Sequence, residues 1–334
     1  MPLSDDYQLV VDSLNSPAGS AVYSEAPAAS YAASEGFADR SASLADQRLN
    51  DLRCGTSSGN GGKGLRAWGQ IFGNAAHQGG QDGFQGFDLY GEGGSAGIDT
   101  ANMFQSAIVG ASLSYGRIRM DARDPTMTDT DINSYQATLY GDYDLGDHVF
   151  MRGLAAYART VNDTTRNSFG TTNRGSYGAN EFSFLAKAGK TFQYDAMFVT
   201  PSVTGRWIHY NPADYNETGA GGFHVSQSSV DSVEVGPSVD VSWKLRSEGG
   251  GWIVPSVHAG YRFDLAHDSI TTTYTGGGGP IIATSPPASQ SRINLGTALT
   301  FYTTNAWEFK AGYDADVKQN FLAHTGIFRG TVRY

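Results

Sequence analysis

A strict two-residue alternation of side-chain character recurs between Gly64 and Tyr334, and it limits what this chain can fold into. The same pattern occupies segments 233–244, 253–264, 307–317 and 325–334. In 307–317 the apolar residues Trp307, Phe309, Ala311, Tyr313, Ala315 and Val317 alternate with Glu308, Lys310, Gly312, Asp314 and Asp316. This period predicts strands with one apolar and one polar face.

The positions of the aromatic residues indicate what the apolar face touches. Tyr135 and Tyr143 lie on one face of a predicted strand, with Ala137, Leu139 and Gly141 between them. They are separated by about 26 Å along the strand, or about 20 Å of height after a tilt near 40°. Aromatic residues also end other apolar faces: Tyr115, Trp243, Trp307 and Tyr334. A soluble β-sandwich would instead place its aromatics mid-strand, so the pattern favours a lipid-facing barrel.

Composition excludes several other classes. The net charge of -10 argues against a nucleic-acid partner, which would require a basic surface. A single cysteine, Cys54, forms no internal disulfide or cysteine metal cluster. We find no run of about 18 apolar residues, so helical membrane spans are not expected. Only 17% of residues are charged and 12% are aromatic, which fits an outer-membrane barrel.

Counting the alternating segments predicts twelve antiparallel strands. Their expected ranges are 64–73, 94–100, 103–120, 131–145, 148–162, 176–192, 196–210, 224–245, 251–270, 288–303, 306–318 and 321–334. Long polar connections are expected at 74–93, 163–174, 211–222 and 271–287. Short turns are expected at 144–147, 194–195, 248–250 and 304–305. Short turns on one rim and long loops on the other are typical of bacterial outer-membrane barrels, with the short turns periplasmic.

The first 53 residues have a different composition. They carry eight acidic residues against three basic ones and show no strand alternation. Between Ser34 and Arg53 a stripe of small apolar residues at steps of three and four predicts a helix: Ala38, Ala42, Ala45, Leu49 and Leu52. We therefore divide the chain into a passenger-end remnant (1–20), a helix segment (21–55), a glycine-rich linker (56–63) and the barrel (64–334). No signal peptide opens the sequence, and we expect Met1 to begin a fragment.

A twelve-stranded barrel is wider than the eight-stranded kind that side chains can fill. A helix about 10 Å across would fit its lumen. We expect three helix arginines, Arg40, Arg48 and Arg53, to pair with carboxylates of the lumen wall. The expected charged wall residues are Glu181, Lys187, Arg206, Glu234, Asp240, Arg262, Asp264, Glu308, Lys310 and Arg329.

The ordered set of elements resembles the C-terminal translocator domain of monomeric autotransporters of type Va secretion. The resemblance covers about residues 14–334. It is carried by the helical run 31–53, the glycine linker, the first strand Gly64-Leu65-Arg66-Ala67-Trp68-Gly69-Gln70 and the terminal Phe328-Arg329-Gly330-Thr331-Val332-Arg333-Tyr334. Tyr334 stands where the family usually ends in Phe or Trp. The resemblance implies an all-β, twelve-stranded membrane barrel with the N-terminal helix threaded through its lumen.

The resemblance also implies a function and partners. It implies an outer-membrane translocator that anchors an upstream passenger and helps export it to the cell surface. Outer-membrane lipids, the barrel-assembly machinery and periplasmic chaperones are the implied partners of a monomer. Its assembly signal would include Phe328, Val332 and Tyr334. The alternative is a porin-like channel for small solutes, in which residues 1–60 have no role.

Candidate catalytic residues are few, and we expect no enzyme, metal or cofactor. His258 shares a strand face with Ser256, near Asp264, but a polar lumen wall accounts for all three, because no nucleophile elbow accompanies them. Some autotransporters cleave themselves inside the barrel, which makes Asn50 a weak candidate. It is followed by Asp51, whereas the self-cleaving asparagine subgroup has paired asparagines.

Overall fold

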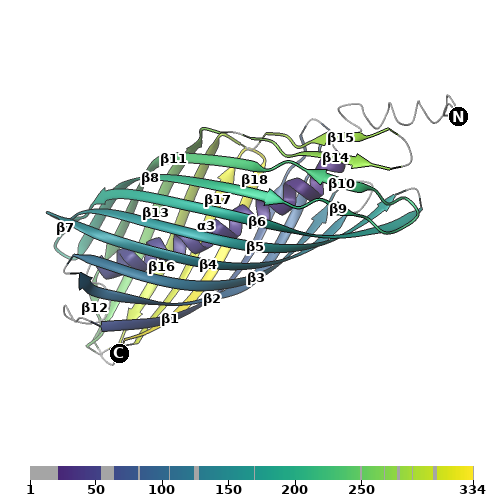
Figure 1. Ribbon diagram of the computed structural model, residues 1–334. Coiled ribbons are helices and arrows are strands. Elements are labelled where there is room, and N and C mark those ends of the chain that lie inside the picture. Colours follow the sequence, from purple (N-terminus) through teal and green to yellow (C-terminus); the bar gives the residue numbers. More distant parts are fainter. Residues whose placement is uncertain are drawn as a thin grey trace, which may run out of the picture.

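The computed structural model describes residues 22–53, 64–81, 83–104, 106–123, 128–168, 170–248, 250–266, 268–276, 279–287, 289–303 and 307–333. Within them twelve long strands form a closed antiparallel barrel (Figure 1). The strands are β1 (Gly64–Gln78), β2 (Phe87–Phe104), β3 (Ala107–Ala122), β4 (Asp129–Gly146), β5 (Val149–Ser168), β6 (Thr171–Lys190), β8 (Met197–Pro212), β11 (Val230–Trp243), β13 (Trp252–Asp264), β16 (Ser291–Tyr302), β17 (Trp307–Lys318) and β18 (Phe321–Arg333). The predicted twelve-stranded membrane barrel is confirmed.

Closure is made between the first and last strands. β1 pairs with β2 on one side and with β18 on the other, from Arg66 opposite Arg333 to Gln78 opposite Phe321. Each strand pairs with the next long strand in the chain, including β8 with β11. No strand of the barrel is therefore left with an open edge facing lipid.

The two rims of the barrel differ. At one rim, which we call the short-turn rim, β2 ends at Phe104, β3 begins at Ala107, and Gly146 and Asp147 make a tight turn with positive φ. At the opposite, loop rim, four short strands form a separate sheet: β9 (Tyr215–Asn216), β10 (His224–Gln227), β14 (Thr271–Thr275) and β15 (Ile281–Thr284). Two further short strands, β7 (Phe192–Tyr194) and β12 (Leu245–Arg246), lie at the short-turn rim.

Several predicted strand limits were wrong. The expected loop 163–174 is a hairpin, because β5 runs to Ser168 and β6 begins at Thr171. The expected loop 74–93 narrows to 79–86, and the expected loops 211–222 and 271–287 contain β9, β14 and β15. The expected strand 224–245 is divided among β10, β11 and the first residue of β12. The polar residues of these segments predict loops. In the structure, backbone hydrogen bonds continue the strands beyond the apolar band, where neither face of a strand has to contact lipid.

The apolar parity of the strands faces outward, as the alternation predicts. Leu113, Ile71 and Leu139 are 70%, 66% and 65% exposed, and both leucines lie opposite alanines on the two neighbouring strands. Tyr115, Tyr135, Tyr143 and Trp307 are also exposed on this face, while Trp243 is half-buried. Such a continuous apolar surface is stable only against the hydrocarbon of a bilayer.

A short 3₁₀ turn η1 (Val22–Ser24) and the helix α3 (Glu25–Arg53) occupy the barrel interior (Figure 1). α3 begins beside β14 and β15 at the loop rim, and its residues near Arg48 reach the short-turn rim. The expected segments 1–20 and 56–63, with Cys54, lie outside the described residues. In the described part of the chain, no helix combines the length and apolarity needed to cross a bilayer.

Leu139→Arg is expected to destabilise the folded barrel in lipid vesicles by about 2–4 kcal/mol, because it places a charge at mid-height of the lipid face. Leu145→Arg is the matched control, since Leu145 is also an exposed leucine of β4 but lies at the short-turn end. Its cost is expected to be about 0–1 kcal/mol. Urea unfolding in vesicles measures both changes, and equal costs would contradict the assignment of this face to lipid.

Candidate functional site

The candidate site is the interface between α3 and the lumen wall. Part of that interface is apolar. Near the loop rim, Ala29 and Ala33 pack against Phe87, Ile118 and Met120 from β2 and β3. Near the short-turn rim, a second buried cluster joins the helix to β1, β4 and β5: Ala42, Leu44, Ala45, Leu49, Trp68, Tyr140, Leu154 and Ala156. The small helix residues let the backbone approach the wall closely, as the predicted stripe requires.

A cluster of charges holds the middle of α3. Glu35 accepts hydrogen bonds from Arg292 Nη2 at 3.0 Å and from Lys318 Nζ at 2.8 Å. Asp39, one helical turn further on, pairs with Arg206, Arg262 and Arg292. These bases come from four strands on one side of the barrel, β8, β13, β16 and β17. The helix therefore presents its acids to a basic part of the wall.

Asp46 makes a second set of ion pairs on the same helix face. It pairs with Arg152 of β5 and with Lys187 of β6, whose Nζ lies 2.6 Å from Asp46 Oδ2. Arg152 also donates to Asp142 at 3.0 Å and to the side-chain oxygen of Asn50 at 3.1 Å. The Arg152 guanidinium thus binds two helix residues that lie one turn apart, Asp46 and Asn50.

Arg48 forms the third set of ion pairs, in which the helix supplies the base and the wall supplies the carboxylates. Its Nε donates to Asp99 Oδ2 at 2.9 Å and its Nη1 donates to Glu308 Oε2 at 3.2 Å. Arg329 donates to the same Glu308 at 3.1 Å. All four side chains are at most 2% exposed. We call Arg48, Asp99, Glu308 and Arg329 the inner cluster.

The structure places the three helix arginines differently. Arg48 lies against two lumen carboxylates. Arg40 makes no ion pair within 4 Å of a described carboxylate; its guanidinium lies 5.3 Å from the Phe72 ring. The pairing expected for Arg40 is wrong, because its position on the helix turns it toward β1. The side chain of Arg53 lies outside the described residues.

The wall residues face the lumen on the parity that the sequence indicates. Their side chains are buried or half-buried: Glu181, Lys187, Arg206, Glu234, Asp240, Arg262, Asp264, Glu308, Lys310 and Arg329. Not all of them contact the helix. Asp264 instead accepts a hydrogen bond from Ser232 and from the backbone N–H groups of Val233 and Ala266. Asp240 contacts Lys187.

Residues that sequence reasoning missed are Glu35, Asp39 and Asp46 on the helix, and Arg152, Arg292 and Lys318 on the wall. The acids are spaced by four and seven residues, which puts them on one helix face. The excess of acidic over basic residues in the helix could have indicated that the helix binds basic residues of the wall. The strand order that brings Arg292 and Lys318 beside Glu35 was not visible in the sequence.

Aromatic side chains surround the start of the helix at the loop rim. Tyr23 lies in a buried cluster that we call the outer collar: Tyr177, Tyr215, Phe223, Val225, Tyr274, Ile281 and Ala283. Tyr274 donates its hydroxyl to the Tyr23 carbonyl at 2.7 Å, and Tyr177 donates to Ser30 at 2.9 Å. Burial and the nearby Glu217 carboxylate raise the pKa of Tyr274, so it remains a neutral donor. The collar holds the start of the helix at the loop rim.

The remaining candidate residues are His258, Asn50 and the three residues of the expected assembly signal. His258 Nε2 lies 2.7 Å from Asn294 Oδ1 and 3.1 Å from Asp314, and the described residues show no hydrogen bond between His258 and Ser256. Asn50 is held by Arg152, and its self-cleavage remains a prediction. Of the expected assembly signal, Phe328 is 49% exposed to lipid, Val332 is half-buried, and Tyr334 lies outside the described residues.

Comparison with known sequences identifies a family resemblance over most of the barrel. The family model described as "Autotransporter beta-domain" matches residues 67–314. Outer membrane protein B of Rickettsia conorii is 23% identical over 283 residues, and that of Rickettsia japonica is 24% identical over 289 residues. Each alignment covers 80% of this chain but only 17% of the relative, so this chain spans a small part of the relatives' length.

Solved structures share the fold. The translocator domain of autotransporter NalP from Neisseria meningitidis superposes with a TM-score of 0.67 at 19% identity, covering 89% of this chain and 98% of that one. The transport unit of autotransporter AIDA-I from Escherichia coli gives 0.61 at 12% identity, covering 80% and 90%. Both comparisons support the same barrel architecture.

Proposed function

The chain belongs to the autotransporter β-domain family, and on this premise we propose how its barrel and helix serve export. The barrel is a translocator domain of the bacterial outer membrane, and the family implies an upstream passenger. We propose that the boundaries fall at 21–55 for the lumen helix, 56–63 for the linker and 64–334 for the barrel, with 1–20 as the end of the passenger.

One observation carries the proposal, which is the direction of α3. The helix starts at the loop rim, where Tyr23 lies in the outer collar, and runs toward the inner cluster near the short-turn rim. In bacterial outer-membrane barrels the short turns are periplasmic. A polypeptide that continues N-terminally from residue 22 would therefore emerge on the cell surface while remaining covalently joined to the barrel.

The charged residues then have defined roles. We propose that Arg48 with the inner cluster, and the acids Glu35, Asp39 and Asp46 with their wall partners, stop the helix in the lumen after export. Arg40 contributes charge beside Phe72, and we propose that Arg53 pairs with a lumen carboxylate. We further propose that Phe328, Val332 and Tyr334 are read by the barrel-assembly machinery, that periplasmic chaperones deliver the unfolded chain, and that the inserted barrel is a monomer.

Surface display tests this function. A secretory signal and an epitope are fused upstream of Pro2, the fusion is expressed in a Gram-negative host, and intact cells are treated with protease. We expect the epitope to be lost from intact cells while the barrel is protected. The control is the same fusion in cells whose outer membrane is permeabilised, which shows that the periplasmic turns become accessible only then.

The opposite result would favour a porin-like channel. In that case the epitope stays protected in intact cells although the barrel is correctly inserted, because the N-terminus remains periplasmic. The presence of a packed helix in the lumen is the observation against this alternative, since an open channel would require that space.

A further inference from the structure

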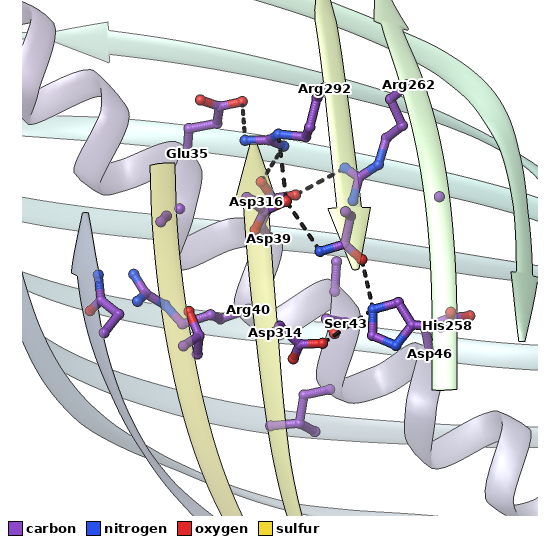
Figure 2. A pocket seen from close by; sticks show the side chains of 18 of the residues that line it. Glu35, Asp39, Arg40, Ser43, Asp46, His258, Arg262, Arg292, Asp314 and Asp316 are labelled. Atoms are coloured by element: carbon purple, nitrogen blue, oxygen red, sulfur yellow. Dashed lines mark hydrogen bonds and ion pairs between the residues drawn. The ribbon is translucent and has the colours of Figure 1, made fainter. Parts of the chain in front are cut away.

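The helix does not fill the lumen evenly. The backbone of α3 lies close to β2, β3, β4, β5 and β6, whereas β8, β13, β16 and β17 are reached through long charged side chains, and a cavity of about 130 Å³ lies beside the helix. The cavity is bounded by Ser43 and Arg40 of the helix and by His258, Asp314 and Asp316 of the wall, as Figure 2 shows. It has room for several water molecules.

A second hollow opens at the loop rim on the same side. This mouth cleft has a volume of about 640 Å³ and lies among Phe84, Phe87, Pro286 and Phe321. The cavity and the cleft share three residues in their linings, Ala32, Glu35 and Phe321. The two hollows therefore adjoin, and the Glu35–Lys318 ion pair stands where they meet.

The other end of the cavity is closed. The last helix residue in its lining is Gln47, and the next residue, Arg48, enters the inner cluster. Leu49, Trp68 and Tyr140 pack beside that cluster, and Trp68 donates to Tyr140 at 2.9 Å. Solvent that entered at the loop rim would thus stop before the short-turn rim.

The polar lining indicates that the cavity holds water. Five buried atoms on it have no hydrogen-bond partner among the described residues: Arg40 Nε, Gln47 Oε1, Gln70 Oε1, Asn74 Oδ1 and Arg292 Nε. Buried polar atoms are nearly always hydrogen-bonded, and water supplies the bond where protein does not. The lining carries six carboxylates and four permanent bases, and Lys318, Arg206 and Arg152 beside it pair with three of those carboxylates, so the cavity is polar without a marked net charge.

We propose that the two hollows form one aqueous vestibule that admits small water-soluble solutes. The vestibule is open to the cell surface and closed at its periplasmic end by the inner cluster. The outward direction of the opening rests on the proposed function. The vestibule is a dead-end space beside the anchored helix, distinct from a conducting channel.

Cysteine labelling in intact cells tests this. The native thiol is removed with Cys54→Ser, and single cysteines are introduced by Ser43→Cys or Ser41→Cys. Ser43 lines the cavity, whereas Ser41, two residues away on the same helix, is buried against the wall. Both changes are nearly isosteric. The probes are a membrane-impermeant cationic methanethiosulfonate and its anionic counterpart.

We expect Ser43→Cys to react about tenfold or more faster than Ser41→Cys, which reacts only through local opening of the helix. The cationic and the anionic reagent should both show this difference, because the charges of the lining are paired. Equal, slow labelling of both positions would overturn the vestibule.

A third position separates this inference from the proposed function. Thr275→Cys lies exposed on β14 at the loop rim. Labelling of Thr275→Cys without Ser43→Cys in intact cells would reject the vestibule alone. Labelling of both only after the outer membrane is permeabilised would reject the outward orientation, and with it both proposals.

Discussion

Removing residues 21–55 is expected to raise the single-channel conductance of the barrel in planar bilayers by about fivefold or more, because a twelve-stranded barrel leaves a lumen that wall side chains do not fill. The helix that occupies this space is about 10 Å across. Its removal also leaves Arg152, Arg292 and Lys318 without their helix carboxylates. The open pore should therefore become more selective for anions than the intact protein.

The control is a variant that lacks only residues 1–20, which should conduct like the full chain. Folding of each variant is checked by the shift of its electrophoretic mobility on heating. A correctly folded deletion variant with unchanged conductance would contradict the assignment of α3 as a plug. Increased conductance without increased anion selectivity would support the assignment of α3 as a plug but would contradict the proposed effect of the basic wall on selectivity.

Arg48→Met is expected to weaken the docking of α3 by about 3–5 kcal/mol, since removing one partner strands buried charge. Asp99 would lose its guanidinium partner, while Glu308 would keep Arg329. Hydrogen–deuterium exchange of the α3 amides in lipid measures the change. Exchange should accelerate most strongly around residue 48, because local opening of the docked helix becomes easier.

Two matched variants sharpen this result. Arg48→Lys keeps the positive charge but lacks the planar guanidinium that donates to both Asp99 and Glu308. It should therefore lose less docking free energy than Arg48→Met. Arg48→Met combined with Asp99→Asn removes the stranded charge and should recover part of the loss. Identical exchange in the wild type and in Arg48→Met would show that the inner cluster does not anchor the helix.

Some features of the site follow from local sequence periodicity. The alternation along 307–317 assigns Glu308 to the lumen and Phe309 to lipid without any knowledge of neighbouring strands. The same reasoning places Arg329 inside and Phe328 outside. It failed where polar strands continue beyond the bilayer, as in the β5–β6 hairpin, because polarity alone does not distinguish a solvated ladder from a loop.

The partners of these side chains were not predictable in the same way. Arg48 and Arg40 are eight residues apart on one helix, yet Arg48 binds two carboxylates and Arg40 lies over Phe72. Glu35 meets Arg292 and Lys318, which lie more than 250 residues away in the chain. Helix rotation and strand register decide such contacts, and neither is encoded in a local pattern.

The sequence by itself determined the class of fold, the number of barrel strands, the face that each strand turns to lipid and the presence of a helix with small residues. These properties depend on side-chain periods of two and 3.6 residues, which act over short stretches. Only the tertiary structure decided which charges pair, where α3 leans and where water has room. Those outcomes depend on barrel closure, which brings distant strands around one helix at a fixed depth and rotation.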